Sequence, residues 1–134
     1  MKTLWLDKMT SPQVKAALAD GFHTVLLAVG STEQHGPHLP LGTDALIGDR
    51  LVERLAQRLG KTLLAPTIRV GASEHHMTFS GTITLREETL EEVIVDCCRS
   101  LSRHGFRLIV LIPTHGGNTA TVMRSGTRLE REGL

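Results

Sequence analysis

Apolar and polar positions along this chain repeat at helical spacing in four segments. A helix is predicted to begin at Ser11-Pro12 and to stop at Gly21, because proline is favoured in the first helical turn and glycine beyond the last. Longer amphipathic helices are predicted over residues 44–60 and 87–104, and a last helix from Thr119 onward. Asp44 is expected to cap the second helix, whose apolar side would consist of Leu46, Ile47, Leu51, Val52, Leu55 and Leu59.

Short apolar, β-branched runs separate these helices and predict strands. Residues 107–112 form the clearest buried strand, and residues 23–29 form a second one. Residues 62–70 are a further extended stretch that Pro66 interrupts, and residues 82–85 are a short strand or connector. Because strands alternate with helices of crossover length, the pattern predicts an α/β fold with a mainly parallel sheet.

The chain length bounds the number of domains. Its 134 residues are enough for one domain, 1–134, with a core of its own. In an α/β fold a crossover helix leads to another strand, yet the last predicted helix runs to the chain end at Gly133-Leu134. Three or four strands are also few for a doubly wound sheet. We therefore expect the domain to be C-terminally incomplete.

Composition narrows the classes of partner. The net charge is +1 and aromatic residues make up 3%, so neither nucleic acid nor an anionic membrane is an expected partner. Residues 1–8 contain no apolar signal region, and no apolar run approaches the ~20 residues of a membrane span. Cys97 and Cys98 are adjacent, which disfavours a disulfide between them and fits small buried side chains in a reducing cytoplasm.

Candidate chemistry lies in the loops that follow the predicted strands, where ligands of open parallel sheets collect. These loops carry Glu33, His35, His38 and Asp44, then Ser73, Glu74, His75 and His76, then His115 with its neighbours. Glu33 and His35 are two residues apart and would point to the same side of an extended segment. Two carboxylates and two imidazoles are a reasonable ligand set for Zn²⁺ or Mn²⁺, and a carboxylate can bridge two ions about 3.5–4 Å apart.

Several of these residues also have a structural interpretation. Asp44 could serve only as a helix cap, and His38 is favoured as a solvated loop residue beside a proline. His75 and His76 cannot both point inward from one extended strand, so one of them is expected at the surface. His23 and His104 stand at the edges of predicted elements and are expected to be structural or solvated.

Three blocks of sequence resemble the creatininase (creatinine amidohydrolase) family, in its His-Gly-Gly-Asn form. The first runs from Gly30 through Glu33-Gln34-His35-Gly36-Pro37-His38 to Thr43-Asp44. The second is Glu74-His75 with Phe79-Ser80-Gly81-Thr82-Ile83, and the third is Thr114-His115-Gly116-Gly117-Asn118. They occur in the family's order, and the resemblance covers almost the whole chain.

The resemblance implies a three-layer α/β/α sandwich and a two-metal centre with zinc or manganese. It implies hydrolysis of amide or cyclic amide bonds in a small-molecule substrate, with metal-bound hydroxide as nucleophile, and it suggests a homo-oligomer. Carried over by motif, Glu33 and His115 would hold one metal, His35 the other, and Asp44 would bridge both. Ser73 is the candidate substrate contact.

The chain also departs from the family pattern. Gly116 and Gly117 stand where creatininase has a tyrosine and a glutamate, which argues against creatinine as substrate and removes one ligand of the second metal. A later His-Ala-Gly block, expected in members of this form, does not follow. Three hypotheses stay open: a truncated amidohydrolase, an inactive metal-binding or structural subunit, and a split enzyme whose remaining ligands come from another chain.

Overall fold

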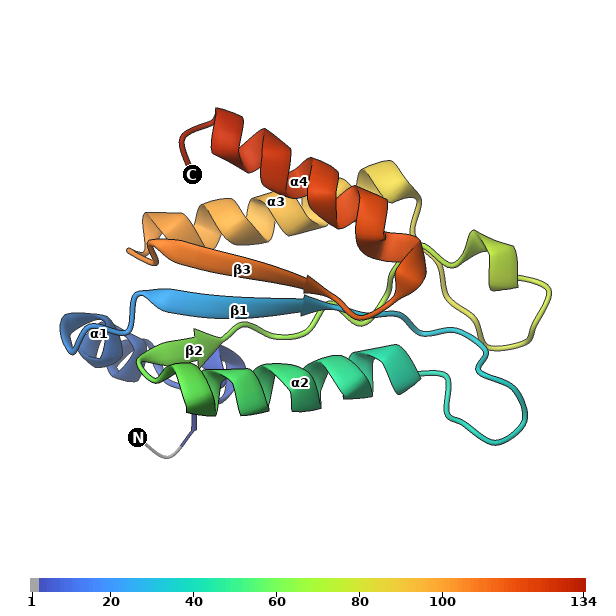
Figure 1. Ribbon diagram of the computed structural model, residues 1–134, viewed down its shortest axis with the longest axis horizontal. Coiled ribbons are helices and arrows are strands. Elements are labelled where there is room, and N and C mark those ends of the chain that lie inside the picture. The colour runs from blue at the N-terminus through green and yellow to red at the C-terminus, as the bar shows by residue number, and fades with distance from the viewer. Residues whose placement is uncertain (1–2) are drawn as a thin grey trace.

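A computed structural model describes residues 3–134 of the chain. Met1 and Lys2, the first residues of the stretch searched for a signal region, lie outside the described part. Three parallel strands form one sheet in the order β2-β1-β3, with helices on both faces (Figure 1). The strands are β1 (Thr24–Val29), β2 (Thr62–Leu64) and β3 (Leu108–Pro113). The α-helices are α1 (Ser11–Ala19), α2 (Thr43–Leu59), α3 (Glu87–Arg103) and α4 (Thr119–Arg131), and the short 3-10 turns are η1 (Leu6–Lys8), η2 (Glu74–His76) and η3 (Gly116–Asn118).

The central strand β1 shows how the sheet is buried on both faces. Val25, Leu27 and Val29 pack in a core cluster with residues of α1, α3 and α4. Leu26 and Ala28, at the alternate positions, pack against Val52 and Ala56 of α2 in a second cluster. Side chains of a strand alternate between the faces of the sheet, so this division places one helix layer on each side. The predicted three-layer α/β/α sandwich with a parallel sheet is confirmed.

The helix α2 begins one residue earlier than predicted, and only part of its predicted apolar side faces the sheet. Gly42 is its N-cap, so Asp44 lies inside the first turn and the prediction that it caps the helix is wrong. Of the predicted apolar side, Val52 is buried and Leu55 packs against the core, but Leu46, Ile47, Leu51 and Leu59 are exposed. The rest of the buried side is made of the small residues Ala45, Gly48 and Ala56. Small side chains let the helix approach closely: a Cβ at Gly48 would lie 3.1 Å from Cβ of Ala28.

Two strand predictions also need correction. The extended stretch predicted over residues 62–70 pairs as β2 only through Leu64, and Ile68 makes one further bridge with Val29. Pro66 in between has no N–H to give to a ladder. The strand β3 was expected to be the clearest buried strand, but its ends are exposed and its middle is half-buried. It pairs with β1 on one side and forms an edge of the sheet among residues 3–134.

The remaining predictions concern helices, thiols and membrane spans. The bounds of α1, α3 and α4 agree with prediction to within two residues. Cys98 is buried in the core and Cys97 is half-buried, both as free thiols, and burial raises the pKa of Cys98 to about 11. Within residues 3–134, no helix combines the length and the apolar character needed to cross a membrane.

Candidate metal centre

The segments that follow the three strands meet at one end of the sheet (Figure 1). Glu33 follows β1, Asp44 begins α2 and His115 follows β3, and all three side chains are buried although they are polar. His35 lies beside them and is half-buried. The structure therefore brings together the four residues that the sequence singled out as metal ligands.

The carboxylate of Asp44 stands between the two histidines. Its Oδ1 lies 3.1 Å from Nε2 of His35, and its Oδ2 lies 3.0 Å from Nδ1 of His115. Ser31 holds the carboxylate in place, since its hydroxyl donates a hydrogen bond of 2.8 Å to Oδ2. The Thr114 hydroxyl donates to the Asp44 backbone carbonyl at 2.8 Å and so ties the start of α2 to the loop after β3.

The other ring nitrogen of each histidine is hydrogen-bonded to a backbone carbonyl. Nε2 of His115 lies 2.9 Å from the Ala72 carbonyl oxygen, and Nδ1 of His35 lies 3.1 Å from the Glu33 carbonyl oxygen. A carbonyl only accepts, so these nitrogens carry the protons. In a neutral ring the nitrogen that faces Asp44 then has a lone pair. Backbone carbonyls orient metal-binding histidines in this way in many metalloproteins.

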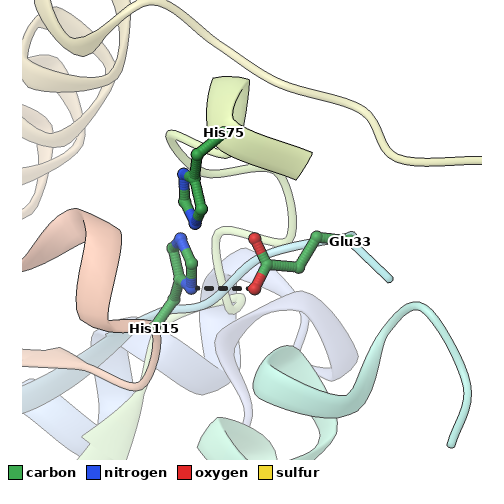
Figure 2. Close-up of side chains that lie close together, drawn as sticks. All are labelled: Glu33, His75 and His115. Atoms are coloured by element: carbon green, nitrogen blue, oxygen red, sulfur yellow. Dashed lines mark ion pairs between the residues drawn. The ribbon is translucent and has the colours of Figure 1, made fainter. Parts of the chain in front are cut away.

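Glu33 adds a second carboxylate on the His115 side. Its Oε1 lies 3.3 Å from Nδ1 of His115 (Figure 2), and its Oε2 is buried with no hydrogen-bond partner among residues 3–134. Carboxylate oxygens and imidazole lone pairs are all acceptors, so their convergence in a buried place requires a cation between them. The unpartnered Oε2 is thus the observation that makes these residues fit a divalent metal.

Electrostatics at His35 agree with a site for positive charge. Burial alone would lower the pKa of His35, but the hydrogen bond to the Glu33 carbonyl and the negative charge of Asp44 raise it above its ordinary value. The site therefore stabilises a positive charge on Nε2, the atom that faces Asp44. A proton and a metal ion compete for that position.

His75 and His76 are closer to the centre than the sequence suggested. The sequence places them in a loop and predicts one of them at the surface, and His75 is exposed. The loop contains the 3-10 turn η2, in which successive side chains do not lie on opposite faces. Nε2 of His76 lies 3.8 Å from Oε1 of Glu33, and the ring of His75 is parallel to that of His115 with centroids 5.9 Å apart. Both histidines therefore approach the Glu33–His115 side of the centre.

Other candidates stand apart from this cluster or play a different part. His38 is exposed in the loop before α2, in keeping with a solvated residue. His23 pairs through Nδ1 with the Gly105 carbonyl at 3.2 Å, and His104 is the exposed C-cap of α3. Ser73 is fully buried, and its hydroxyl has no hydrogen-bond partner within the described residues.

Asn118 was not predicted to have a role, yet it holds three loops together. Its side-chain nitrogen donates to the carbonyls of Val29 and Gly30 at 3.2 and 2.8 Å, and its oxygen accepts from the Ala72 N–H at 3.0 Å. Gly71 makes the approach possible, because a Cβ there would lie 2.6 Å from the Asn118 oxygen. Only the His-Gly-Gly-Asn motif pointed to Asn118, without a function for its side chain.

Comparison with known proteins shows which family the chain belongs to. Residues 7–134 match the creatininase family, described as creatinine amidohydrolase. The chain is 40% identical over 118 residues to the mycofactocin precursor peptide peptidase of Mycobacterium ulcerans, covering 82% of this chain and 47% of that protein. It is 31% identical over 127 residues to creatinine amidohydrolase of Pseudomonas putida, covering 91% of this chain and 48% of that enzyme.

Solved structures agree with these relatives. A creatininase described as the Mn form superposes with a TM-score of 0.89 at 31% identity, over 98% of this chain and 52% of that one. Another neighbour is a creatininase variant described as Zn-Zn type, at 29% identity and a TM-score of 0.88, over 100% of this chain and 55% of that one. The chain spans about half the length of the curated relatives it matches.

Proposed function

The chain belongs to the creatininase family, and on that premise we propose that it acts in the metal-dependent hydrolysis of amide or cyclic amide C–N bonds. The observation that carries this proposal is Asp44, whose two carboxylate oxygens face a different histidine each. Such a carboxylate suits the bridge of a two-metal centre. The hydrolases among the relatives support the reaction class.

In this proposal the four sequence-predicted ligands divide between two ions. Glu33, Asp44 and His115 would hold one ion, and His35 with Asp44 would contribute to the second. Zinc or manganese is proposed because both accept this mixture of oxygen and nitrogen ligands, and because structural neighbours are described as Mn and Zn-Zn forms. When bound, such ions polarise a carbonyl and activate water for attack on it.

Residues of this chain would prepare the site before any ion arrives. Ser31 fixes the Asp44 carboxylate, while the carbonyls of Glu33 and Ala72 hold His35 and His115 in the tautomers that leave a lone pair inward. Ser73, with its unpartnered buried hydroxyl, is proposed to contact the substrate. The substrate would be a small-molecule amide, and the glycines at 116 and 117 argue against creatinine itself.

A second candidate is a family member that binds metal without catalysing hydrolysis. The specific observation in its favour is Gly117, where a Cβ would lie 2.5 Å from Nε2 of His115 and 2.7 Å from the Ala72 carbonyl oxygen. That position has no room for an acidic side chain in this conformation, so within the described residues the second ion would depend on His35 and Asp44, with an oxygen of Glu33 within 4.8 Å of their ligand atoms. In either case we propose a homo-oligomer, and the free cysteines favour the cytoplasm.

Metal content of two variants tests the bridging assignment. Asp44→Ala removes the carboxylate shared by both ions, so we expect it to lower bound zinc or manganese, measured by elemental analysis, by more than half. His38→Ala is the matched control, because it also removes a polar loop side chain but lies outside the cluster. Equal metal content in the two variants would refute the bridge. Assays on small amides with metal-loaded wild type then separate the two candidates, since only the first predicts turnover that Asp44→Ala abolishes.

A further inference from the structure

His115 lies between groups that compete for its proton. Its Nδ1 lies 3.0 Å from Oδ2 of Asp44 and 3.3 Å from Oε1 of Glu33 (Figure 2), while its Nε2 lies 2.9 Å from the Ala72 carbonyl oxygen. All of these oxygens accept hydrogen bonds, but a neutral imidazole has only one proton to donate. A proton on Nδ1 would exclude a metal ion from that nitrogen. Metal binding by His115 therefore depends on the Ala72 carbonyl, which draws the proton to Nε2.

Asn118 holds the segment that carries this carbonyl. Its side-chain oxygen accepts from the Ala72 N–H at 3.0 Å. Its side-chain nitrogen donates to the carbonyls of Val29 and Gly30 at 3.2 and 2.8 Å. Asn118 is fully buried, and the three contacts define the orientation of its amide, because only the nitrogen can donate. Ala72 is thereby tied to the end of β1, the strand that leads to Glu33.

Gly117 leaves room for the contact between His115 and Ala72. A Cβ at position 117 would lie 2.5 Å from Nε2 of His115 and 2.7 Å from the Ala72 carbonyl oxygen, so any side chain there would push the ring and the carbonyl apart. A Cβ at the neighbouring Gly116 would meet open space among residues 3–134. The hydrogen bond from His115 to Ala72 therefore requires glycine at 117 but not at 116.

We propose that Asn118 is a positioning residue for His115, which acts through Ala72, and that the glycine at 117 serves the same contact. The inference rests on the proposed function and deepens it, because it names what directs the lone pair of His115 toward the metal. Position 117 then has a role of its own in this chain, although the family resemblance alone describes it as a lost acidic ligand.

The two adjacent glycines provide a matched pair of substitutions. Gly117→Ala separates His115 from Ala72, so in the metal-free variant we expect the proton of the neutral ring to move toward Nδ1, as NMR of the imidazole nitrogens measures. Its affinity for Zn²⁺, measured by competition with a chelator, should fall about 10-fold to 100-fold, which is typical for loss of a group that orients a metal ligand. Gly116→Ala is the control and should change neither quantity. Circular dichroism checks that both variants are folded.

Asn118 is tested from the other side of Ala72. Asn118 is the N-cap of α4, and serine is equally suited to that position, so Asn118→Ser keeps the start of the helix while its shorter side chain loses the Ala72 N–H. We expect the same change of tautomer and a similar loss of Zn²⁺ affinity. The wild type provides a measurement without substitution, because an amide hydrogen that is held by Asn118 should exchange slowly with solvent. Fast exchange at Ala72 would overturn the role of Asn118.

The possible outcomes separate this inference from the proposed function. A wild-type chain that binds neither Zn²⁺ nor Mn²⁺ would overturn the proposed function, whereas the tautomer of His115 in the metal-free chain still reports whether Asn118 and Gly117 position the ring. An unchanged tautomer in Gly117→Ala and Asn118→Ser would overturn the positioning role alone, even with weaker metal binding, because that result assigns both residues a packing role. Gly117→Glu should bind Zn²⁺ less tightly than the wild type. Tighter binding would also overturn the inference, since position 117 would then supply a ligand.

Discussion

At the scale of single residues, His35 is a probe of the centre's electrostatics. Burial lowers its pKa, but the Glu33 carbonyl and the Asp44 carboxylate outweigh burial and raise it above the ordinary value. A carboxylate 3.1 Å away favours the charged ring, so removing that charge must lower the pKa again. The same carboxylate would hold a metal, and therefore protonation and metal binding at His35 exclude each other.

We predict that the ring of His35 in the metal-free protein titrates above about 6.5, the ordinary value for histidine, and that Asp44→Asn moves its midpoint to lower pH. NMR of the imidazole nitrogens measures both midpoints. Metal affinity on the His35 side should then weaken as the pH falls through the raised pKa, because the proton occupies Nε2. A midpoint that Asp44→Asn does not move would contradict this account.

The sequence identified some residues of the metal centre and missed others, depending on whether their contacts follow from strand ends and motifs or from the folded loops. Glu33, His35, Asp44 and His115 were predicted because strand ends collect at one edge of a parallel sheet and because a family motif marks them. Ser31 and Asn118 were not given roles, since their partners are residues whose approach depends on the folded loops. The sequence predicted that one of His75 and His76 lies at the surface, as His75 does, but it did not predict the turn η2 that brings both rings to the Glu33–His115 side.

At the scale of elements, the sequence predicted the bounds of α2 better than it predicted which side of the helix is buried. Apolar residues at helical spacing predicted its extent to within one residue. They predicted its buried face only in part: Val52 and Leu55 pack against the sheet, but Leu46, Ile47, Leu51 and Leu59 are exposed while Ala45, Gly48 and Ala56 are buried. Periodicity shows where apolar residues gather, but close packing against β1 selects the side with alanine and glycine.

Two substitutions within the predicted apolar side of α2 test which part of that side contacts the sheet. Val52 is fully buried, so Val52→Ala should lower the free energy of unfolding by about 2 kcal/mol through lost contacts and a cavity. Ile47 is 52% exposed, so Ile47→Ala should change it by less than about 0.5 kcal/mol although it removes more carbon. Urea denaturation measures both. A larger loss for Ile47→Ala would mean that Ile47, and not Val52, lies at the contact between α2 and the sheet.

At the scale of the whole molecule, the sequence did not predict the order of the strands in the sheet. Alternation of helices and strands predicted an α/β fold with a mainly parallel sheet, the family resemblance implied three layers, and both are present. It placed the run at residues 107–112 in the interior, whereas β3 lies at an edge with Leu108 56% exposed. Strand order depends on where each crossover connection places the next strand in the sheet. A strongly apolar composition does not by itself distinguish a central strand from an edge strand.

An apolar edge strand presents unpaired backbone groups, and such edges pair with other chains unless they are covered or charged. We predict that the chain associates through β3, in line with the proposed homo-oligomer, and that Leu108→Lys shifts it toward monomer because a charge on the edge opposes strand pairing. Leu59→Lys is the matched control: Leu59 is 62% exposed, but it ends α2, away from the β3 edge. Light scattering coupled to size-exclusion chromatography measures the mass. Since both leucines are exposed, neither change should unfold the chain, so dissociation by Leu108→Lys alone implicates the edge, and equal behaviour of the two variants removes β3 as the contact.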